Sequence, residues 1–226
     1  KNINHLVTHN TAILGILGIG KSMLSLELVE RMIAEGIKVI CIDLTNQYQI
    51  ELAELYDVKT ANIVKKYLQK VGSKGKTAYK QNVQEGGSIN DFSMAMKRVL
   101  RFYLNPKNAK MLLIFNPSEF EVWRQDSKLY NNTASMVSLT PTEITQIITE
   151  SALEIVQELG MIDKARVCLV YEEAHSLVPE WNSAVSDCDK AVTNGTARAI
   201  LQGRKYGLGC LLITQRTANV TKTILN

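Results

Sequence analysis

The stretch from Gly15 to Ser22 constrains the fold of this chain more than any other. It reads GILGIGKS, with a glycine at its first position and a Gly-Lys-Ser triplet at its end. Glycine lets backbone N–H groups approach an anion closely, and a following helix points its positive end at the same place. The pattern therefore predicts a phosphate-binding loop. The alternative is a glycine-rich turn that binds no ligand.

The flanking residues favour the phosphate-binding interpretation. Residues 11–14 (TAIL) are a short apolar strand candidate, and residues 22–36 (SMLSLELVERMIAEG) have helical spacing. A strand before and a helix after is the context that such a loop requires. Lys21 would then reach the outer phosphates of ATP, and the Ser22 hydroxyl would contact Mg²⁺. The other nucleotide-binding candidates are Gly15, Gly18, Ile19, Gly20 and Met23.

The composition is that of a globular protein. The 226 residues are 46% hydrophobic and 21% charged, which predicts one domain or one domain with an insertion. No apolar run has the length of a membrane span, and the first ten residues have no signal-peptide core. We therefore expect a cytoplasmic protein with no membrane partner. The chain starts without Met and ends directly after a predicted strand, so we expect it to be part of a longer protein.

Cysteine spacing argues against a zinc site. The four cysteines contain no CxxC pair. Cys41, Cys168 and Cys210 lie inside predicted buried strands, where cysteine behaves as a small apolar residue. A reducing compartment is consistent with this use.

Charge is distributed unevenly along the chain. The net charge is +4, but residues 59–110 contain twelve Lys and Arg residues against Glu85 and Asp91. A basic block in a nucleotide-binding domain suggests a polyanionic partner such as DNA. The alternative is a solvated insertion without a partner.

The periodicity along the chain predicts an α/β fold. After the first helix, residues 38–44 read as a buried parallel strand, so the chain opens with strand, phosphate loop, helix and strand. The remaining candidates are helices at 51–58, 61–71, 91–104, 139–160 and 196–207, and strands at 110–116, 119–124, 165–175 (ending in acids) and 209–216. The segment of about 55–110 is expected to be an inserted helical, basic segment. Thr140 and Glu143 predict a capping box at the start of the helix over 139–160.

Two carboxylates follow a predicted buried strand. Residues 167–170 place Glu172 and Glu173 at its carboxyl end, the edge at which α/β sheets bind ligands. Glu172 would help to hold Mg²⁺, through water, and Glu173 would orient or deprotonate the attacking water. The alternative is a surface acidic pair. His175 would either respond to the nucleotide or DNA state or have a structural role.

The last predicted strand and the residues before it add two candidates. Gln215 ends the strand, and its amide can contact both the γ-phosphate and the attacking water. Arg204 precedes the strand and would stabilise charge on the transferring phosphate, from a neighbouring subunit. The alternatives are a polar strand end and a cation at a helix C-terminus.

These motifs together resemble the HerA/FtsK branch of P-loop ATPases, in particular bacterial HerA-like proteins with a DUF87-type domain. The similarity rests on ILGILGIGKS, CLVYEEAHSLVPE and GRKYGLGCLLITQRTANVTKTIL, and IDLTNQY at 42–48 is similar to the second-strand motif of that group. Asn46 and Gln47 replace the Gly-Glu of that motif, and Glu172 stands where Asp is common.

The resemblance implies a RecA-like core with strand order 5-1-4-3-2 over residues 1–226, in which Gln215 lies between the γ-phosphate and Glu173. It also implies a homo-oligomeric ring, commonly a hexamer, around double-stranded DNA, with ATP at each subunit interface and Arg204 contributed in trans.

The leading hypothesis is therefore an ATP-hydrolysing ring motor that translocates or unwinds double-stranded DNA. Such motors often work with a nuclease or another effector, in DNA end processing or antiphage defence. The alternative is a nucleotide-gated ring that scaffolds an effector without processive translocation. A third hypothesis is a small-molecule P-loop kinase.

Overall fold

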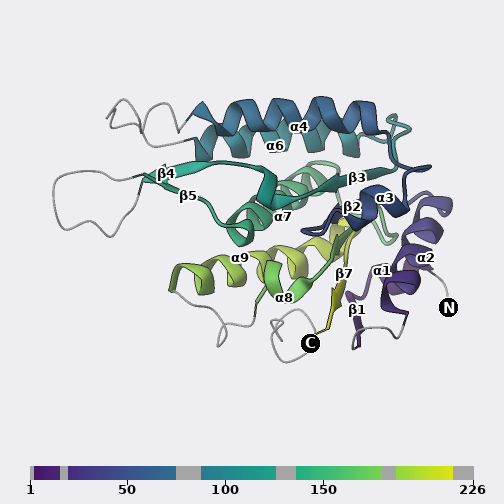
Figure 1. The fold of residues 1–226 in the computed structure, drawn as a ribbon. Helices are drawn as coiled ribbons and strands as arrows, with labels where there is room; N and C mark the ends of the chain where they lie inside the picture. The colour runs from purple at the N-terminus through teal and green to yellow at the C-terminus, as the bar shows by residue number, and fades with distance from the viewer. Residues whose placement is uncertain (1–2, 16–19, 75–87, 126–135, 180–186, 216–226) are drawn as a thin grey trace.

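The computed structural model describes residues 3–15, 20–74, 88–125, 136–179 and 187–215. Its centre is a five-stranded sheet in the order β1-β7-β6-β2-β3, in which every neighbouring pair is parallel (Figure 1). The strands are β1 (Thr11–Leu14), β2 (Lys38–Ile42), β3 (Leu112–Phe115), β6 (Val167–Tyr171) and β7 (Leu208–Thr214). The predicted α/β fold with a parallel central sheet is confirmed.

Four strands follow the expected order. The predicted order 5-1-4-3-2 uses its own strand numbers. β1 corresponds to its strand 1, β7 to its strand 4, β6 to its strand 3 and β2 to its strand 2. β7, which Gln215 follows, therefore lies between β1, which leads into the phosphate loop, and β6, which Glu172 and Glu173 follow. The fifth member of the sheet differs. β3, which follows the inserted segment, pairs with β2, and no strand within the described ranges lies beyond β1.

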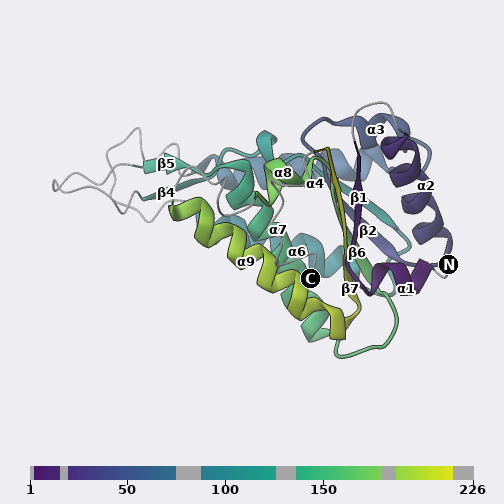
Figure 2. The ribbon, with the colours of Figure 1, turned by 90° about the horizontal axis from the view of Figure 1, so that it is seen from below.

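Helices cover both faces of the sheet (Figure 2). The helices α1, α2 and α3 lie on one side, and α6, α7 and α9 lie on the other. The helical segments are α1 (Ile3–Val7), α2 (Lys21–Ala34), α3 (Gln47–Glu51), α4 (Val58–Gly72), α6 (Ile89–Leu104), α7 (Pro141–Glu158), α8 (Ala174–Leu177) and α9 (Asp187–Gly203), with 3₁₀ turns η1 (Pro117–Glu119) and η3 (Arg204–Tyr206).

The strands β2, β3, β6 and β7 are buried along their whole length, which explains their continuous apolar sequences. Alternate residues of a strand point to opposite faces. In β2, Val39 and Cys41 belong to the core with α1 and α2, whereas Ile40 and Ile42 belong to the core with α6, α7 and α9. Cys41, Cys168 and Cys210 are all buried strand residues, as the sequence predicts.

The inserted segment adds a layer beyond α7. α6 packs on α7, and α4 packs on α6, so α4 forms the outermost layer on that side (Figure 1). Leu68 is the fully buried anchor of α4 in this core. The strand prediction at 119–124 is wrong for most of its length, since only its last two residues belong to a strand, β4 (Trp123–Gln125). β4 pairs with β5 (Met136–Ser138) in an antiparallel hairpin apart from the main sheet.

Two helix predictions need correction. The predicted helix over 51–58 is wrong for most of its length, since α3 ends at Glu51 and α4 begins only at Val58. Asp57 separates them, because its side chain accepts from the Thr60 N–H at 3.1 Å and caps α4. α9 extends from 187 to 203, well beyond the predicted start at 196.

The capping box of α7 is confirmed. The Thr140 hydroxyl accepts from the Glu143 N–H at 3.3 Å, and the Glu143 carboxylate accepts from the Thr140 N–H at 2.8 Å. The same carboxylate also accepts from Arg124 Nε at 2.9 Å, which ties the hairpin to α7. Among the described residues, no helix combines the length and hydropathy needed to cross a membrane.

Candidate active site

Three of the predicted site residues, Gly15, Glu172 and Gln215, lie at one edge of the sheet. Because β1, β7, β6 and β2 are parallel, their carboxyl ends lie together. Each strand is directly followed by a residue of the site: Gly15 after β1, Gln215 after β7, Glu172 after β6 and Asp43 after β2. This is the edge at which open α/β sheets bind ligands.

The phosphate-loop residues link β1 to α2. Gly15 donates its N–H to the Thr214 carbonyl at 3.3 Å, which continues the pairing of β1 with β7. Gly20 has φ 82° and ψ 15°, a left-handed conformation that favours glycine, and it immediately precedes α2. The strand-loop-helix context predicted from the sequence is thus present. Gly18 and Ile19 lie outside the described residues.

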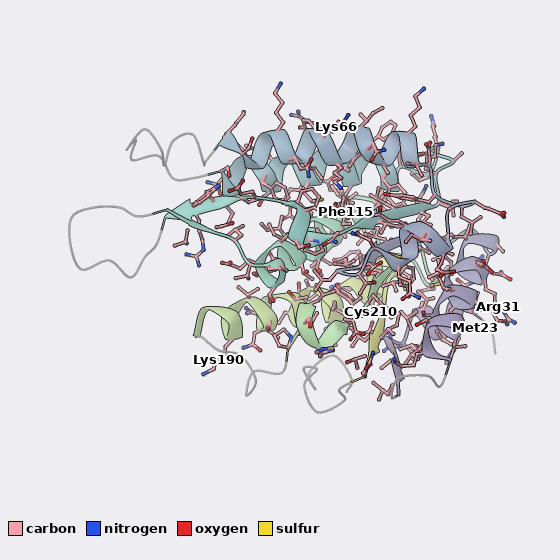
Figure 3. The ribbon with its side chains drawn as sticks, viewed as in Figure 1. Met23, Arg31, Lys66, Phe115, Lys190 and Cys210 are labelled. Atoms are coloured by element: carbon pink, nitrogen blue, oxygen red, sulfur yellow. The ribbon has the colours of Figure 1, made fainter. Side chains whose placement is uncertain are left out.

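The first turn of α2 presents Lys21 and Ser22 to this edge. Both side chains are partly buried. The adjacent Met23 is 78% exposed on the outer side of α2 (Figure 3). The N–H groups at the start of a helix have no partners within the helix and suit an anion.

Glu172 is a buried carboxylate in this site. Its side chain is 6% exposed and accepts a hydrogen bond from the Tyr48 hydroxyl at 2.9 Å. Burial raises the pKa of Glu172 to about 7, and the negative charges of Asp43 and Glu173 act in the same direction. The Tyr48 hydrogen bond and the positive charge of Lys21 oppose this rise. Lys21 therefore lies close enough to Glu172 to interact with its charge.

Asp43 shapes the loop that carries Tyr48. Its carboxylate accepts from the Thr45 N–H at 2.7 Å, from the Thr45 hydroxyl at 2.6 Å and from the Tyr48 N–H at 3.0 Å. Asn46 adopts φ 60°, which turns the chain into α3. Burial raises the pKa of the Tyr48 hydroxyl, which keeps it protonated as a donor to Glu172.

The role of Tyr48 was missed in the sequence analysis. The IDLTNQY segment was identified there as a motif, but no pattern in one sequence pairs Tyr48 with a residue 124 positions away. The tyrosine in the motif is the only local signal that pointed toward this contact.

Glu173 lies between the ends of β6 and β7. Its backbone is left-handed, with φ 53°, and it begins α8. Gln215 Nε2 donates to Glu173 Oε1 at 3.2 Å, and Glu173 Oε2 lies 3.2 Å from His175 Nδ1. The Glu173 side chain is 25% exposed, so it remains accessible to water.

His175 connects the two strands a second time. Its Nδ1 lies 3.1 Å from the Thr214 hydroxyl as well as near Glu173. Thr214 and Gln215 are consecutive residues at the end of β7. The carboxyl ends of β6 and β7 are thus joined through side chains, at the position where the sequence predicts catalysis.

Arg204 is not part of this cluster within the chain. It is exposed in η3, at the amino end of β7, whereas Gln215 follows the carboxyl end. The seven residues of β7 place these ends roughly 20 Å apart. Arg204 lines a shallow depression with His9 and Asp163 instead.

The arrangement can bind a phosphate and position a water molecule. Lys21 and the start of α2 supply positive charge, and Glu173 and Gln215 supply an acceptor and an amide next to it. The described residues contain no cluster of three or more His, Cys, Asp or Glu side chains suited to hold a metal ion. Mg²⁺ in nucleotide sites often needs only one or two protein ligands, since substrate phosphates and water supply the others.

A family comparison supports this interpretation. Residues 2–65 match the family model of the central domain of helicase HerA. The predicted resemblance to HerA-type ATPases is confirmed. The prediction that the chain is an ATPase is confirmed with it. The matched segment contains the phosphate loop, α2, β2 and the Asp43–Tyr48 turn.

Similar solved structures include the genome packaging NTPase B204 from Sulfolobus turreted icosahedral virus 2 in complex with ATP-gammaS. It is 12% identical, with a TM-score of 0.46 over 99% of this chain and 71% of that chain. VirB4 of Thermoanaerobacter pseudethanolicus is 14% identical, with a TM-score of 0.44 over 92% of this chain and 69% of that chain. Similarity at this level carries no functional conclusion. No curated protein matches the chain.

Proposed function

We propose that residues 1–226 form the RecA-like motor domain of a ring-forming ATPase that translocates or unwinds double-stranded DNA. The observation that carries the proposal is the convergence, at one sheet edge, of the start of α2, the acidic pair after β6 and the amide after β7. Elements far apart in the sequence are needed to build this cluster. A glycine-rich turn without a ligand would not require them.

ATP would bind with its phosphates at the start of α2. The backbone N–H groups of the loop and Lys21 would contact the phosphates. The left-handed Gly20 supports this assignment, because it turns the chain into α2 so that the free N–H groups of the helix face the site. The remaining backbone contacts are assigned to Gly15, Gly18, Ile19 and Met23.

Mg²⁺ would be held by Ser22 and, through water, by Glu172. The residues fit a cation, because Glu172 and Asp43 are both buried carboxylates at this edge, and a bound cation would offset the burial that raises the pKa of Glu172. The metal would supply charge stabilisation for the phosphates. Tyr48 would hold the Glu172 carboxylate in place.

Glu173 would act as the base that orients or deprotonates water. Gln215 would contact the γ-phosphate and report its presence. The hydrogen bond between these two side chains supports the assignment, because a γ-phosphate contact of Gln215 would compete directly with its contact to Glu173.

Arg204 would act on the ATP of a neighbouring subunit. The position of Arg204 at the opposite end of β7 supports action in trans, since it is too far from Gln215 to serve the same site. A homo-oligomeric ring, commonly a hexamer, would place the arginine of one subunit at the nucleotide of the next. An arginine in this role contributes about 10³–10⁵ in rate.

Double-stranded DNA is the proposed substrate, with a nuclease or another effector as partner in end processing or antiphage defence, in the cytoplasm. The basic charge of residues 59–110 and the match to a helicase domain support a DNA partner. The alternative is a nucleotide-gated ring that scaffolds an effector without processive translocation.

DNA-stimulated ATP hydrolysis by the full-length protein tests the proposal. We expect duplex DNA to raise the hydrolysis rate, and we expect the stimulation to fall as salt increases. Hydrolysis that depends on oligomer formation but not on DNA would favour the scaffold. Hydrolysis by monomers, stimulated by a small-molecule acceptor, would favour a kinase and contradict the proposal.

A further inference from the structure

Among the described residues of 59–110, eight Lys and Arg side chains fall into two groups; the other two are Arg98, which donates to the Tyr67 hydroxyl at 3.4 Å, and Lys107. Lys65 pairs with Glu119 at 2.7 Å, Lys97 with Glu154 at 2.6 Å, and Arg101 with Glu158 at 2.6 Å. Lys110 pairs with Asp57, and Lys74 lies 4.0 Å from Asp91. Each of these five cations thus has an acidic partner within the domain.

Three lysines of α4 form the second group. Lys59, Lys66 and Lys70 are exposed, and none has an ion pair with an acid among the residues that the structure describes. With 3.6 residues per turn, positions 59, 66 and 70 lie on one side of the helix. We call these three residues the lysine row.

The lysine row faces solvent. α4 is the outermost helix on its side of the domain, and long side chains ending in nitrogen project from it (Figure 3). The buried side of the helix carries Ala61 and Leu68 instead. α4 itself contains no Asp or Glu between Val58 and Gly72, so no acid within the helix interrupts the row.

We infer that the lysine row is a contact surface for the phosphate backbone of duplex DNA, separate from the nucleotide site. This inference rests on the proposed function, in which duplex DNA is the substrate. The row is roughly 16 Å long, a length over which duplex DNA carries about ten negative charges. A straight row of unpaired cations is complementary to such a linear polyanion.

The residue type agrees with backbone contacts. Lysine is a flexible point charge suited to phosphates, whereas the planar fork of arginine is better suited to bidentate recognition. The row would therefore position DNA without sequence preference. Ile63 also faces solvent on this side and is 62% exposed, which an acidic protein partner would cover. Such a partner is the alternative outcome of the test.

The test compares two triple variants of the full-length protein that remove the same charge. The first combines K59Q, K66Q and K70Q. The second combines K65Q, K97Q and R101Q, whose side chains are already paired with Glu119, Glu154 and Glu158. Affinity for a duplex without a specific sequence is measured across a salt series, and binding of an ATP analogue and thermal melting are measured as folding controls.

We expect the lysine-row variant to reduce the slope of log affinity against log salt by about 3, or about one per lost phosphate contact. The control triple should keep the wild-type slope, and both variants should bind the ATP analogue normally. Equal slopes in all three proteins, or equal reductions in both triples, would overturn the inference.

Two further outcomes separate the possible failures. Unchanged DNA binding with weaker binding of poly-L-glutamate by the lysine-row variant would overturn the inference and indicate an acidic protein partner. No binding of duplex DNA by the wild-type protein at low salt would contradict the proposed function itself. Failure of the proposed function is thereby distinguished from failure of the lysine row alone.

Discussion

Gln215 and Glu173 share a hydrogen bond of 3.2 Å, from the amide Nε2 to the carboxylate Oε1, across 42 residues of sequence. The second carboxylate oxygen faces His175 Nδ1 at 3.2 Å. Glu173 is therefore held on both sides by groups that also contact, or belong to, the end of β7. In the proposed mechanism, a γ-phosphate that attracts Gln215 would release one of these two restraints.

Glu173→Gln should retain ATP binding and lose turnover. The amide preserves the shape of the side chain but cannot accept a proton from water, so hydrolysis should fall by about 10²–10⁴. Binding of a fluorescent ATP analogue and phosphate release measure the two properties separately. Wild-type hydrolysis in this variant would remove Glu173 from the proposed mechanism.

The effect of a His175 substitution on kcat should depend on whether the new side chain still has an N–H group. Asn can place its amide near the position of Nδ1, so His175→Asn should keep kcat within about threefold, whereas His175→Leu should lower kcat by up to about a hundredfold, because Glu173 loses one orienting contact. ATP-analogue binding should stay unchanged in both. Equal losses in the two variants, with equal drops in melting temperature, would indicate a structural role for His175.

Arg204→Ala should be rescued by a complementary inactive protein. A ring that mixes Arg204→Ala with Glu173→Gln subunits contains some interfaces with an intact Glu173 on one side and an intact Arg204 on the other. Mixed rings should therefore regain a fraction of the wild-type hydrolysis, measured after co-assembly at several ratios. Complete inactivity of verified mixed rings would argue against a shared site.

The metal-free protein should lose stability as pH rises from about 4.5 to about 7. In this window the folded state keeps a proton on Glu172 that the unfolded chain releases, since the pKa of Glu172 is raised to about 7 in the fold. The free energy of unfolding should therefore fall across the window, by roughly 3 kcal/mol. Urea denaturation in a chelator measures this, and Glu172→Gln should flatten the dependence. An identical slope in that variant would contradict the assignment.

Tyr48→Phe should weaken the binding of Mg²⁺ that supports hydrolysis. Without the Tyr48 hydroxyl, the buried Glu172 loses the hydrogen bond that it accepts from Tyr48. This loss raises the free energy of the ionised carboxylate by about 1–3 kcal/mol. The Mg²⁺ concentration for half-maximal hydrolysis should rise several-fold. Tyr56→Phe is the matched control, because Tyr56 lies in the groove beside α4 and away from Glu172. Equal effects of the two substitutions would contradict a specific role of Tyr48.

Local signals in the sequence were sufficient to predict several helices and strands. The capping box at Thr140 and Glu143 predicted the start of α7, because both hydrogen bonds join residues three apart. Continuous apolar runs predicted the buried parallel strands, and the resemblance predicted the order of four of them, β1, β7, β6 and β2, but not the pairing of β3 with β2. The convergence at the sheet edge followed from these two kinds of information.

Contacts set by the tertiary structure were not predictable in this way. The helical propensity of residues 51–58 gave no indication that Asp57 caps the next helix, where its carboxylate also pairs with Lys110. Likewise, Tyr48 reaches Glu172 only because β2 and β6 are adjacent. The distribution of charge in the inserted segment was visible, but its division into paired and unpaired lysines required the positions of Glu119 and Glu154.

β7 carries Gln215 at one end and Arg204 just before the other, and it is the second strand of a tightly packed sheet. A strand with neighbours on both sides cannot bend easily, so, in the proposed mechanism, a shift at the Gln215 end would be transmitted along its axis. In the proposed ring, loss of phosphate from one pocket would thus alter the arginine delivered to the next. Such coupling would make the subunits of the ring hydrolyse ATP in a fixed order.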